Sequence, residues 1–301
     1  MDNWHLKLFS KSVLKKEKWH QINRLLPNLD NKACLDLGSD NGVISYLLRQ
    51  QGGQWTSADL SMETVNSIES LVKTNVVHID NPPHLPFADH AFDVIVIVDM
   101  LEHVEDDHAF ALEIKRILKP EGELIVLAPH KVSWSLIRPL QYMLGLTDEK
   151  HGHVRPGYTK KELAELFDSF DVATSRAYSR FFSELIDIII CFGMGLLKGS
   201  EFRVQSSECT SQNPEPRTPN SSNVATQNSE LGTQNLSERA TQNTEPSKGN
   251  VVTSHDMNKY KKLFMAYSLT YPLFWLFAQF DHLIFFLSGH KLIVKMKRWE
   301  V

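Results

Sequence analysis

Short apolar runs alternate with helical stretches across residues 33–128, and this alternation constrains the fold more than any other feature of the chain. Five apolar or β-branched runs end in turn residues and predict strands at 33–37, 54–59, 75–79, 92–98 and 122–128. Helices are predicted between them at 42–51, 61–73 and 106–118. Strands separated by helices of this length form right-handed crossovers, so the sequence predicts a doubly wound α/β fold of the Rossmann-like type.

The composition divides the rest of the chain. Residues 200–255 are rich in Ser, Thr, Asn, Gln, Glu and Pro, and we predict a disordered linker there. The flanking segments are apolar, and they predict an apolar helix at 181–199 and an apolar helical insertion at 256–289. Residues 170–180 and 290–298 read as a sixth and a seventh strand, the latter within a terminal segment at 290–301.

The amino-terminal segment, residues 1–29, is predicted to be a helical cap. Apolar residues recur at helical spacing among lysines over residues 3–26. This pattern fits a basic amphipathic helix on anionic lipid, or a cap over a ligand cleft, and we favour the cap.

Charge and cysteine usage exclude some classes of function. A formal charge of −4 and an isoelectric point near 6.4 argue against a protein that coats nucleic acid. The three cysteines form no CxxC pair and no disulfide framework, which indicates a reducing, cytoplasmic environment.

The turn after the first predicted strand has the features of a ligand-binding loop. Gly38 and Gly42 let the backbone turn tightly and approach a ligand closely. The spacing is GxxxG, whereas a dinucleotide site has GxGxxG. Asp40 stands between the two glycines, where it requires a negative φ or a left-handed conformation that Asp tolerates.

The carboxylates around this turn indicate the kind of ligand. Asp36 and Asp40 make the turn a poor cradle for pyrophosphate but suit a ligand with a positive charge. Asp59 ends the second strand, where a carboxylate can accept hydrogen bonds from two ribose hydroxyls. Asp80 follows the third strand and could accept from the exocyclic amine of a purine. An adenosine with a cationic tail and no phosphate fits this set, and S-adenosylmethionine is such a molecule.

Several motifs together resemble the class I S-adenosylmethionine-dependent methyltransferases over residues 30–175. The likeness is strongest to the type 11 group that includes the ubiquinone and menaquinone enzymes. The matching residues are Leu35-Asp36-Leu37-Gly38 with Gly42, Ala58-Asp59-Leu60, Leu85-Pro86-Phe87, Phe92-Asp93-Val94-Ile95-Val96, Leu101-Glu102-His103-Val104 and Leu118-Lys119-Pro120-Glu121-Gly122. The chain departs from the family at Asp40, and 80–85 is about one residue longer than usual.

The resemblance implies a seven-stranded sheet with an antiparallel last strand, in a methyltransferase domain at 30–180. It implies S-adenosylmethionine as the cofactor, with the methionine part by the first turn, the ribose at the end of the second strand and the adenine by the third. The implied cofactor-binding residues are Asp36, Gly38, Asp40, Gly42, Asp59, Leu60, Asp80, Asn81 and Asp99.

Three histidines are candidates for a general base: His103, His130 and His153. Such residues also commonly just line an acceptor pocket. The stretch Asp99–His103 resembles the metal set of some RNA and quinone methyltransferases, with His153 as a further ligand. The same motif occurs in metal-free relatives, where His103 packs or caps a helix, and we predict no metal.

The apolar insertion bears on membrane contact. The uncharged run at 263–280 would span ~27 Å as a helix, short of a ~30 Å hydrocarbon core. A single crossing is excluded if strands six and seven share one sheet. Glu184 and Asp187 leave no adequate partner for a second crossing. We therefore expect two helices beside the active site that dip into a membrane surface, with a soluble lid over an apolar pocket as the alternative.

The predicted function is methyl transfer to a small apolar or lipid-linked acceptor, such as a quinone precursor or a lipid-carried glycan. A cytoplasmic protein in peripheral contact with a membrane is expected, and nucleic acid is not expected as a partner. The alternatives are a metal-assisted RNA methyltransferase and a non-catalytic S-adenosylmethionine-binding partner of a membrane protein.

Overall fold

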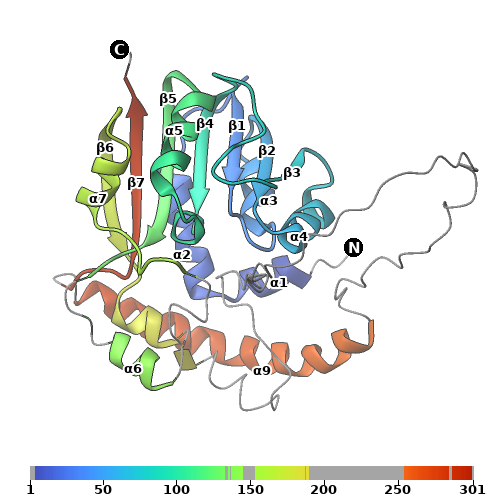
Figure 1. The fold of residues 1–301 in the computed structure, drawn as a ribbon. Helices are drawn as coiled ribbons and strands as arrows, with labels where there is room; N and C mark the ends of the chain where they lie inside the picture. The colour runs from blue at the N-terminus through green and yellow to red at the C-terminus, as the bar shows by residue number, and fades with distance from the viewer. Residues whose placement is uncertain are drawn as a thin grey trace, which may run out of the picture.

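The computed structural model describes residues 4–132, 135, 137–144, 153–186, 188–189, 254–284 and 287–299. Its centre is a seven-stranded sheet in the order β3-β2-β1-β4-β5-β7-β6, with β7 antiparallel to both of its neighbours (Figure 1). The strands are β1 (Ala33–Leu37), β2 (Gln54–Asp59), β3 (Val76–His78), β4 (Phe92–Val98), β5 (Leu118–Pro129), β6 (Phe170–Tyr178) and β7 (Lys291–Arg298). The predicted α/β fold with an antiparallel last strand is confirmed.

Helices cover both faces of the sheet, and the central strand β4 shows why. Val94 and Val96 pack on one face, while Ile95 and Ile97 pack on the other, and all four are fully buried. A strand buried on both faces needs an unbroken apolar run, because successive side chains point to opposite faces. The covering helices are α3 (Val43–Arg49), α4 (Met62–Val72), α5 (Asp107–Ile117) and α7 (Lys160–Leu166).

The start of β5 differs from the prediction. The strand begins at Leu118, although Lys119-Pro120-Glu121-Gly122 was expected to separate a helix from a strand at 122. Leu118 pairs with Phe92, and the register then shifts before Glu123 pairs with Val94. The turn residues are accommodated as an irregularity within the strand, with Glu121 at a φ of 61°.

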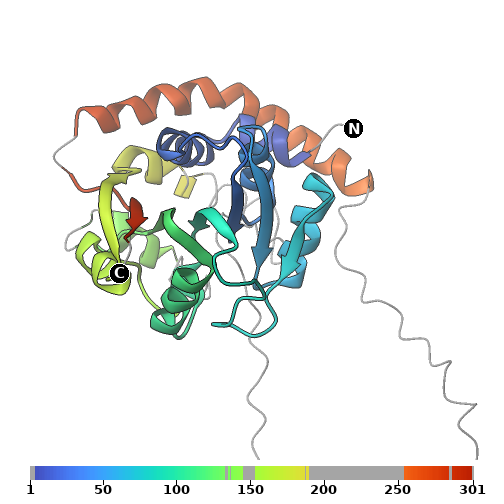
Figure 2. The same ribbon diagram turned by 90° about the horizontal axis from the view of Figure 1, so that it is seen from above.

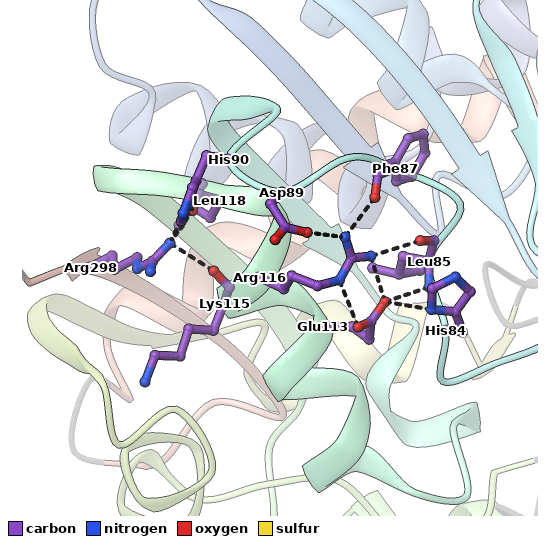
Figure 3. A network of polar contacts seen from close by, with 10 residues as sticks. All are labelled: His84, Leu85, Phe87, Asp89, His90, Glu113, Lys115, Arg116, Leu118 and Arg298. Atoms are coloured by element: carbon purple, nitrogen blue, oxygen red, sulfur yellow. Dashed lines mark hydrogen bonds and ion pairs between the residues drawn. The ribbon is translucent and has the colours of Figure 1, made fainter.

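Arg116 on α5 fixes the long connection between β3 and β4 (Figure 3). Its guanidinium donates hydrogen bonds to the carbonyl oxygens of Phe87 at 2.7 Å and Leu85 at 3.0 Å. Its ion-pair partner Glu113, 2.7 Å away, also accepts from the Leu85 amide at 2.9 Å. The bond with Arg116 lowers the pKa of Glu113 to about 2. The Leu85-Pro86-Phe87 motif is therefore held to α5 through its backbone.

The amino-terminal segment, predicted to be a helical cap, forms two helices, α1 (Trp4–Ser10) and α2 (Val13–Leu25). Ser12 separates them because its backbone is extended and its hydroxyl accepts a hydrogen bond from the Lys15 amide, which caps α2. Helix α1 lies at the carboxyl edge of the sheet (Figure 1), and α2 packs Ile22 into the core on one face of the sheet.

Helix α9 (Ser254–Ala278) fills the connection between β6 and β7, and the short helix η3 (Gln279–His282) follows it. It runs past the carboxyl edge of the sheet beside α2 (Figures 1 and 2), and Lys16 of α2 donates a hydrogen bond to the Tyr271 hydroxyl at 3.0 Å. Its first two residues fall inside the predicted linker, and the linker up to 253 lies outside the described residues.

The first apolar helix of the insertion is described only in part. Residues 181–186 and 188–189 are helical, whereas 190–199 lie outside the described residues. In the described part of the chain, no helix combines the length and the apolar character that crossing a membrane requires.

Candidate functional site

The turn after β1 lies at the carboxyl edge between β2 and β4. Gly38, Asp40 and Gly42 all have positive φ, at 78°, 50° and 78°. A Cβ on Gly38 would lie 2.4 Å from the carbonyl oxygen of Val98, and one on Gly42 would lie 2.7 Å from the Cα of Ile68. Both glycines are therefore required by conformation and by close packing. Asp40 adopts the left-handed conformation that was predicted to be tolerable.

Asp36 lies beneath this turn. Its carboxylate is fully buried and accepts hydrogen bonds from the hydroxyls of Ser39 at 2.6 Å, Ser45 at 2.6 Å and Ser57 at 2.7 Å. Arg49 lies 3.6 Å away, and burial raises the pKa of Asp36 above its ordinary value. Asp36 supports the turn in this conformation, and its contact with a cofactor stays a prediction.

Asp59 ends β2 and is only 4% exposed. One carboxylate oxygen accepts a hydrogen bond from the Ser61 amide at 2.9 Å. Burial raises the pKa of Asp59 to about 7, and the nearby charge of Asp40 adds to the effect. The next residue, Leu60, packs against the core and accepts a hydrogen bond at its carbonyl from His78 at 3.0 Å. Asp59 is therefore poised to titrate near neutral pH.

Asp80 and Asn81 follow β3 and are both exposed. The side chain of Asp80 is 85% exposed and lies 2.6 Å from Nδ1 of His78. The structure therefore leaves these two residues at the surface beyond β3.

Asp99 follows β4 and has a positive φ of 43°. Its carboxylate is ion-paired with Lys18 of α2, and both residues are 8% exposed. Lys291, at the start of β7, lies 3.9 Å from the other oxygen of Asp99. Two cations thus meet one carboxylate at the edge of the predicted cofactor cleft.

The cleft itself is almost closed. Phe9, Lys15 and Lys18 from α1 and α2 cover the turn at residues 38–41, and Lys15 lies 3.8 Å from Asp40. The remaining cavity has a volume of about 20 Å³, whereas ligand pockets typically measure ~300–1,000 Å³. The carboxylates and the close backbone approach fit an adenosine with a cationic tail. Binding of such a ligand at this turn would require α1 and α2 to move away from it.

His103 and His153 gather beside Glu102. The two rings meet edge to face with their centroids 4.9 Å apart, and one ligand atom from each of the three residues lies within 4.8 Å of the others. Glu102 is fully buried. Asp99, which begins the stretch that resembles a metal set, is instead ion-paired with Lys18. The structure thus brings together three residues with suitable chemistry for a divalent ion.

His130 follows β5 and points its Nδ1 at the carbonyl oxygen of Gly289, 2.7 Å away. A carbonyl only accepts, so Nδ1 carries a proton, and in the neutral ring Nε2 would have the lone pair that a general base requires. The adjacent His290 has its pKa lowered to about 4 by burial and by Arg138. His290 is therefore neutral at physiological pH, and so low a pKa makes it a weaker base than an ordinary histidine.

Sequence reasoning missed four residues of this region: Lys18, Tyr178, His290 and Lys291. Lys18 is one lysine among many in an amphipathic segment, so nothing in its pattern marks it. The other three lie at the ends of β6 and β7. The antiparallel pairing of these strands, implied by the resemblance, was a signal that could have located them at the carboxyl edge.

A second cavity, of about 720 Å³, lies apart from the turn. It is enclosed by α2, the end of β6 and the carboxyl half of α9, with η3. None of the predicted cofactor-binding residues lines this cavity. Its larger size is therefore no reason to move the predicted cofactor site away from the turn at residues 38–42.

Comparisons with known proteins agree with this geometry. Residues 35–126 match the family model described as a methyltransferase domain. The ubiquinone biosynthesis O-methyltransferase of Hydrogenovibrio crunogenus is 28% identical over 115 residues, which cover 34% of this chain and 48% of that protein. The chain thus spans about half the length of the curated relatives it matches.

Solved structures match a larger part of the fold. A putative sarcosine dimethylglycine methyltransferase from Galdieria sulphuraria aligns with 95% of this chain and 86% of its own, at 13% identity and a TM-score of 0.50. The cyclase SpnF aligns with 95% of this chain and 82% of its own, at 12% identity and a TM-score of 0.51. Similarity at this level reflects the fold alone. Together with the match of the family model, the strand order identifies residues 35–126 as part of a class I S-adenosylmethionine-dependent methyltransferase domain.

Proposed function

We propose that the protein transfers a methyl group from S-adenosylmethionine to an apolar or lipid-linked acceptor. The observation that carries the proposal is the left-handed turn at Gly38, Asp40 and Gly42, which packs against the end of β4 at Gly38 and against α4 at Gly42. Asp59 would accept the ribose hydroxyls, and the acidic turn would lie by the cationic methionine part.

The bound cofactor supplies an activated methyl group on a positively charged sulfur. The protein therefore has to orient the acceptor and exclude water, and alignment of this kind contributes about 7–11 kcal/mol in favourable cases. If the acceptor is a hydroxyl, Nε2 of His130 is the available base beside the edge of the sheet. A quinone precursor is one such acceptor, and the names of the curated relatives support that class.

The apolar surface of α9 supports a lipid-linked acceptor and a peripheral membrane contact. Leu269, Leu273 and Leu276 are 82%, 68% and 58% exposed. Exposed apolar side chains in such number on one helix are uncommon on a monomeric protein and are typical of interaction surfaces. Insertion of these side chains would bring the carboxyl edge of the sheet to the membrane surface.

Titration calorimetry with S-adenosylmethionine, followed by an assay for S-adenosylhomocysteine with a lipid extract, tests the proposal. Saturable binding and a lipid product heavier by one methylene are expected. Asp59→Ala should weaken cofactor binding by about 1.5–3 kcal/mol, as a charged hydrogen bond is lost. Binding without any product would favour a non-catalytic partner, and no binding at all would contradict the proposal.

An RNA acceptor has less support. The Glu102, His103 and His153 cluster is compatible with a metal-assisted reaction. However, the formal charge of −4 does not favour a nucleic-acid partner. A methylation assay with total RNA in place of lipid separates the two acceptors.

A further inference from the structure

The larger cavity carries an inference about the acceptor. Helix α9 follows β6 and precedes β7 in the sequence, and it packs across α2. The cavity lies where α9, α2 and the end of β6 meet. At about 720 Å³ it has the size of a pocket for an organic ligand. Aromatic side chains of α9, Tyr271 and Trp275, form one wall, and the end of β6 forms another.

Basic side chains outnumber acidic ones around the cavity. Lys16, His20 and Arg24 recur every four residues along α2, while Arg176 and Arg180 come from β6 and its end. Within the part of the chain that the structure describes, no hydrogen bond or ion pair engages the side chain of Arg24 or of Arg176.

The two acidic groups that line the cavity are already engaged. Glu17 accepts a hydrogen bond from Gln21 at 2.6 Å. Asp281 accepts from the backbone amides of Arg180, Phe182 and Ser183 at 2.8–3.2 Å. The charge that remains available to a ligand is therefore positive.

Tyr178 connects the cavity to the predicted site of methyl transfer. It lines the cavity and is 5% exposed, and its hydroxyl makes no hydrogen bond to any described residue. Burial raises its pKa, and Asp99 and Lys291 are close enough to act on it. The phenol is therefore a buried donor between the cavity and the edge of the cofactor cleft.

We propose that this cavity is the acceptor site and that it takes an amphiphile with an acidic group, a phosphate or a carboxylate. The acidic group would bind at Arg24 and Arg176, and the apolar part would lie against Tyr271 and Trp275. The Tyr178 hydroxyl would donate to an oxygen of the acceptor. The assignment as an acceptor site rests on the proposed methyl transfer, whereas binding of the amphiphile does not.

The test uses the full chain and short amphiphiles below their micelle concentration: octyl phosphate, octanoate and, as a neutral control, octanol. Binding is followed by tryptophan fluorescence, with Trp275→Phe to assign the signal, in the absence of S-adenosylmethionine. We expect at least one anionic probe to bind saturably, with an affinity at least tenfold higher than that of octanol. Whichever of octyl phosphate and octanoate binds more tightly indicates whether the site prefers a phosphate or a carboxylate.

Variants locate the binding. The pair Arg24→Gln and Arg176→Gln should weaken it at least tenfold, and Tyr178→Phe several-fold. The matched pair Lys160→Gln and Lys161→Gln on α7 removes the same charge from an exposed helix and should change nothing. Equal affinity for octanol, equal effects of the two charge pairs, or binding to phosphatidylglycerol vesicles alone would overturn the inference. Amphiphile binding without methyl transfer would contradict only the proposed function.

Discussion

Lys18 and Asp99 form a buried ion pair that joins α2 to the end of β4, across the edge of the predicted cofactor cleft. The contact places a positive charge beside the turn where a cationic ligand is expected. It also holds α1 and α2 over that turn, which leaves a cavity of only about 20 Å³. For the cofactor to enter, Lys18 and Asp99 must therefore separate or move together. A substitution in this ion pair should destabilise the closed conformation.

We expect Lys18→Met to loosen the amino-terminal helices. Loss of one partner of a buried ion pair typically costs about 3–5 kcal/mol when the other charge is left uncompensated, and the cost here should be smaller because Lys291 lies 3.9 Å from Asp99. Detachment of α1 and α2 would return water to Asp99. Hydrogen exchange should accelerate over residues 4–25 and remain slow in the sheet, and S-adenosylmethionine should associate faster. Lys160→Met is the surface control, and unchanged exchange over 4–25 would show that the pair does not hold the helices.

Cofactor affinity should rise with pH between 6 and 8. The pKa of Asp59 is raised to about 7, so below that pH the carboxyl is largely protonated and accepts ribose hydroxyls poorly. Above it, the carboxylate is available. The same shift makes the free protein lose stability as pH rises from about 4 to 7, because the folded state holds the proton more tightly than the unfolded state. Calorimetry across this range measures both effects. Asp59→Asn should abolish the pH dependence, and a flat wild-type profile would remove Asp59 from ribose binding.

The fold was predictable because local pattern and tertiary environment agree. The run Phe92-Asp93-Val94-Ile95-Val96 predicts a strand with two buried faces, and at Gly38 and Gly42 an added Cβ would clash with neighbouring backbone. The predicted start of β5 was wrong, because proline and glycine can either end an element or be accommodated within a strand. Pro120 and Gly122 usually separate elements, but here the pairing of Leu118 with Phe92 extends β5 past them.

The site was only partly predictable, for a different reason. Motif residues fix which groups lie at the carboxyl edge, but not which way their side chains point. Asp36 follows the family motif and yet is saturated by three hydroxyls beneath the turn. Lys18 and Tyr178 come from segments far from the motif in sequence, and only the tertiary packing brings them to Asp99.

Arg116→Met should destabilise the domain without changing cofactor affinity. The substitution removes the Arg116 donor from the carbonyl oxygens of Leu85 and Phe87 and from the Glu113 carboxylate, which keeps the Leu85 amide as a donor, and a charged hydrogen bond is worth about 1.5–3 kcal/mol. Urea denaturation measures the loss. The variant should also be less sensitive to acid, because Glu113 would lose the lowered pKa that makes wild-type stability fall as pH drops from about 4.5 towards 2. Stability within 0.5 kcal/mol of wild type would mean that solvent replaces the network.

Chelation of metal ions should leave methyl transfer unchanged. The donor methyl group is already activated, and the edge-to-face contact of His103 with His153 is also a stable packing arrangement without an ion. Turnover before and after EDTA treatment measures this. Activity that falls and returns with Mg²⁺ or Mn²⁺, but not in a Glu102→Gln variant, would assign the cluster as a metal site instead.

The exposed face of α9 should hold the protein at a membrane surface. Leu269 and Leu273 are one helical turn apart and are 82% and 68% exposed, so both can enter the interface without disturbing the core. Burial of a leucine side chain contributes about 1.5–3 kcal/mol, so two glutamates in their place should reduce the affinity for vesicles by at least tenfold. Sedimentation with anionic vesicles measures the bound fraction, and calorimetry with S-adenosylmethionine should show unchanged affinity. Leu112→Glu is the matched control, because Leu112 is 66% exposed on α5, away from α9. Equal release by Leu112→Glu, or no release by the α9 pair, would show that α9 does not dock the protein.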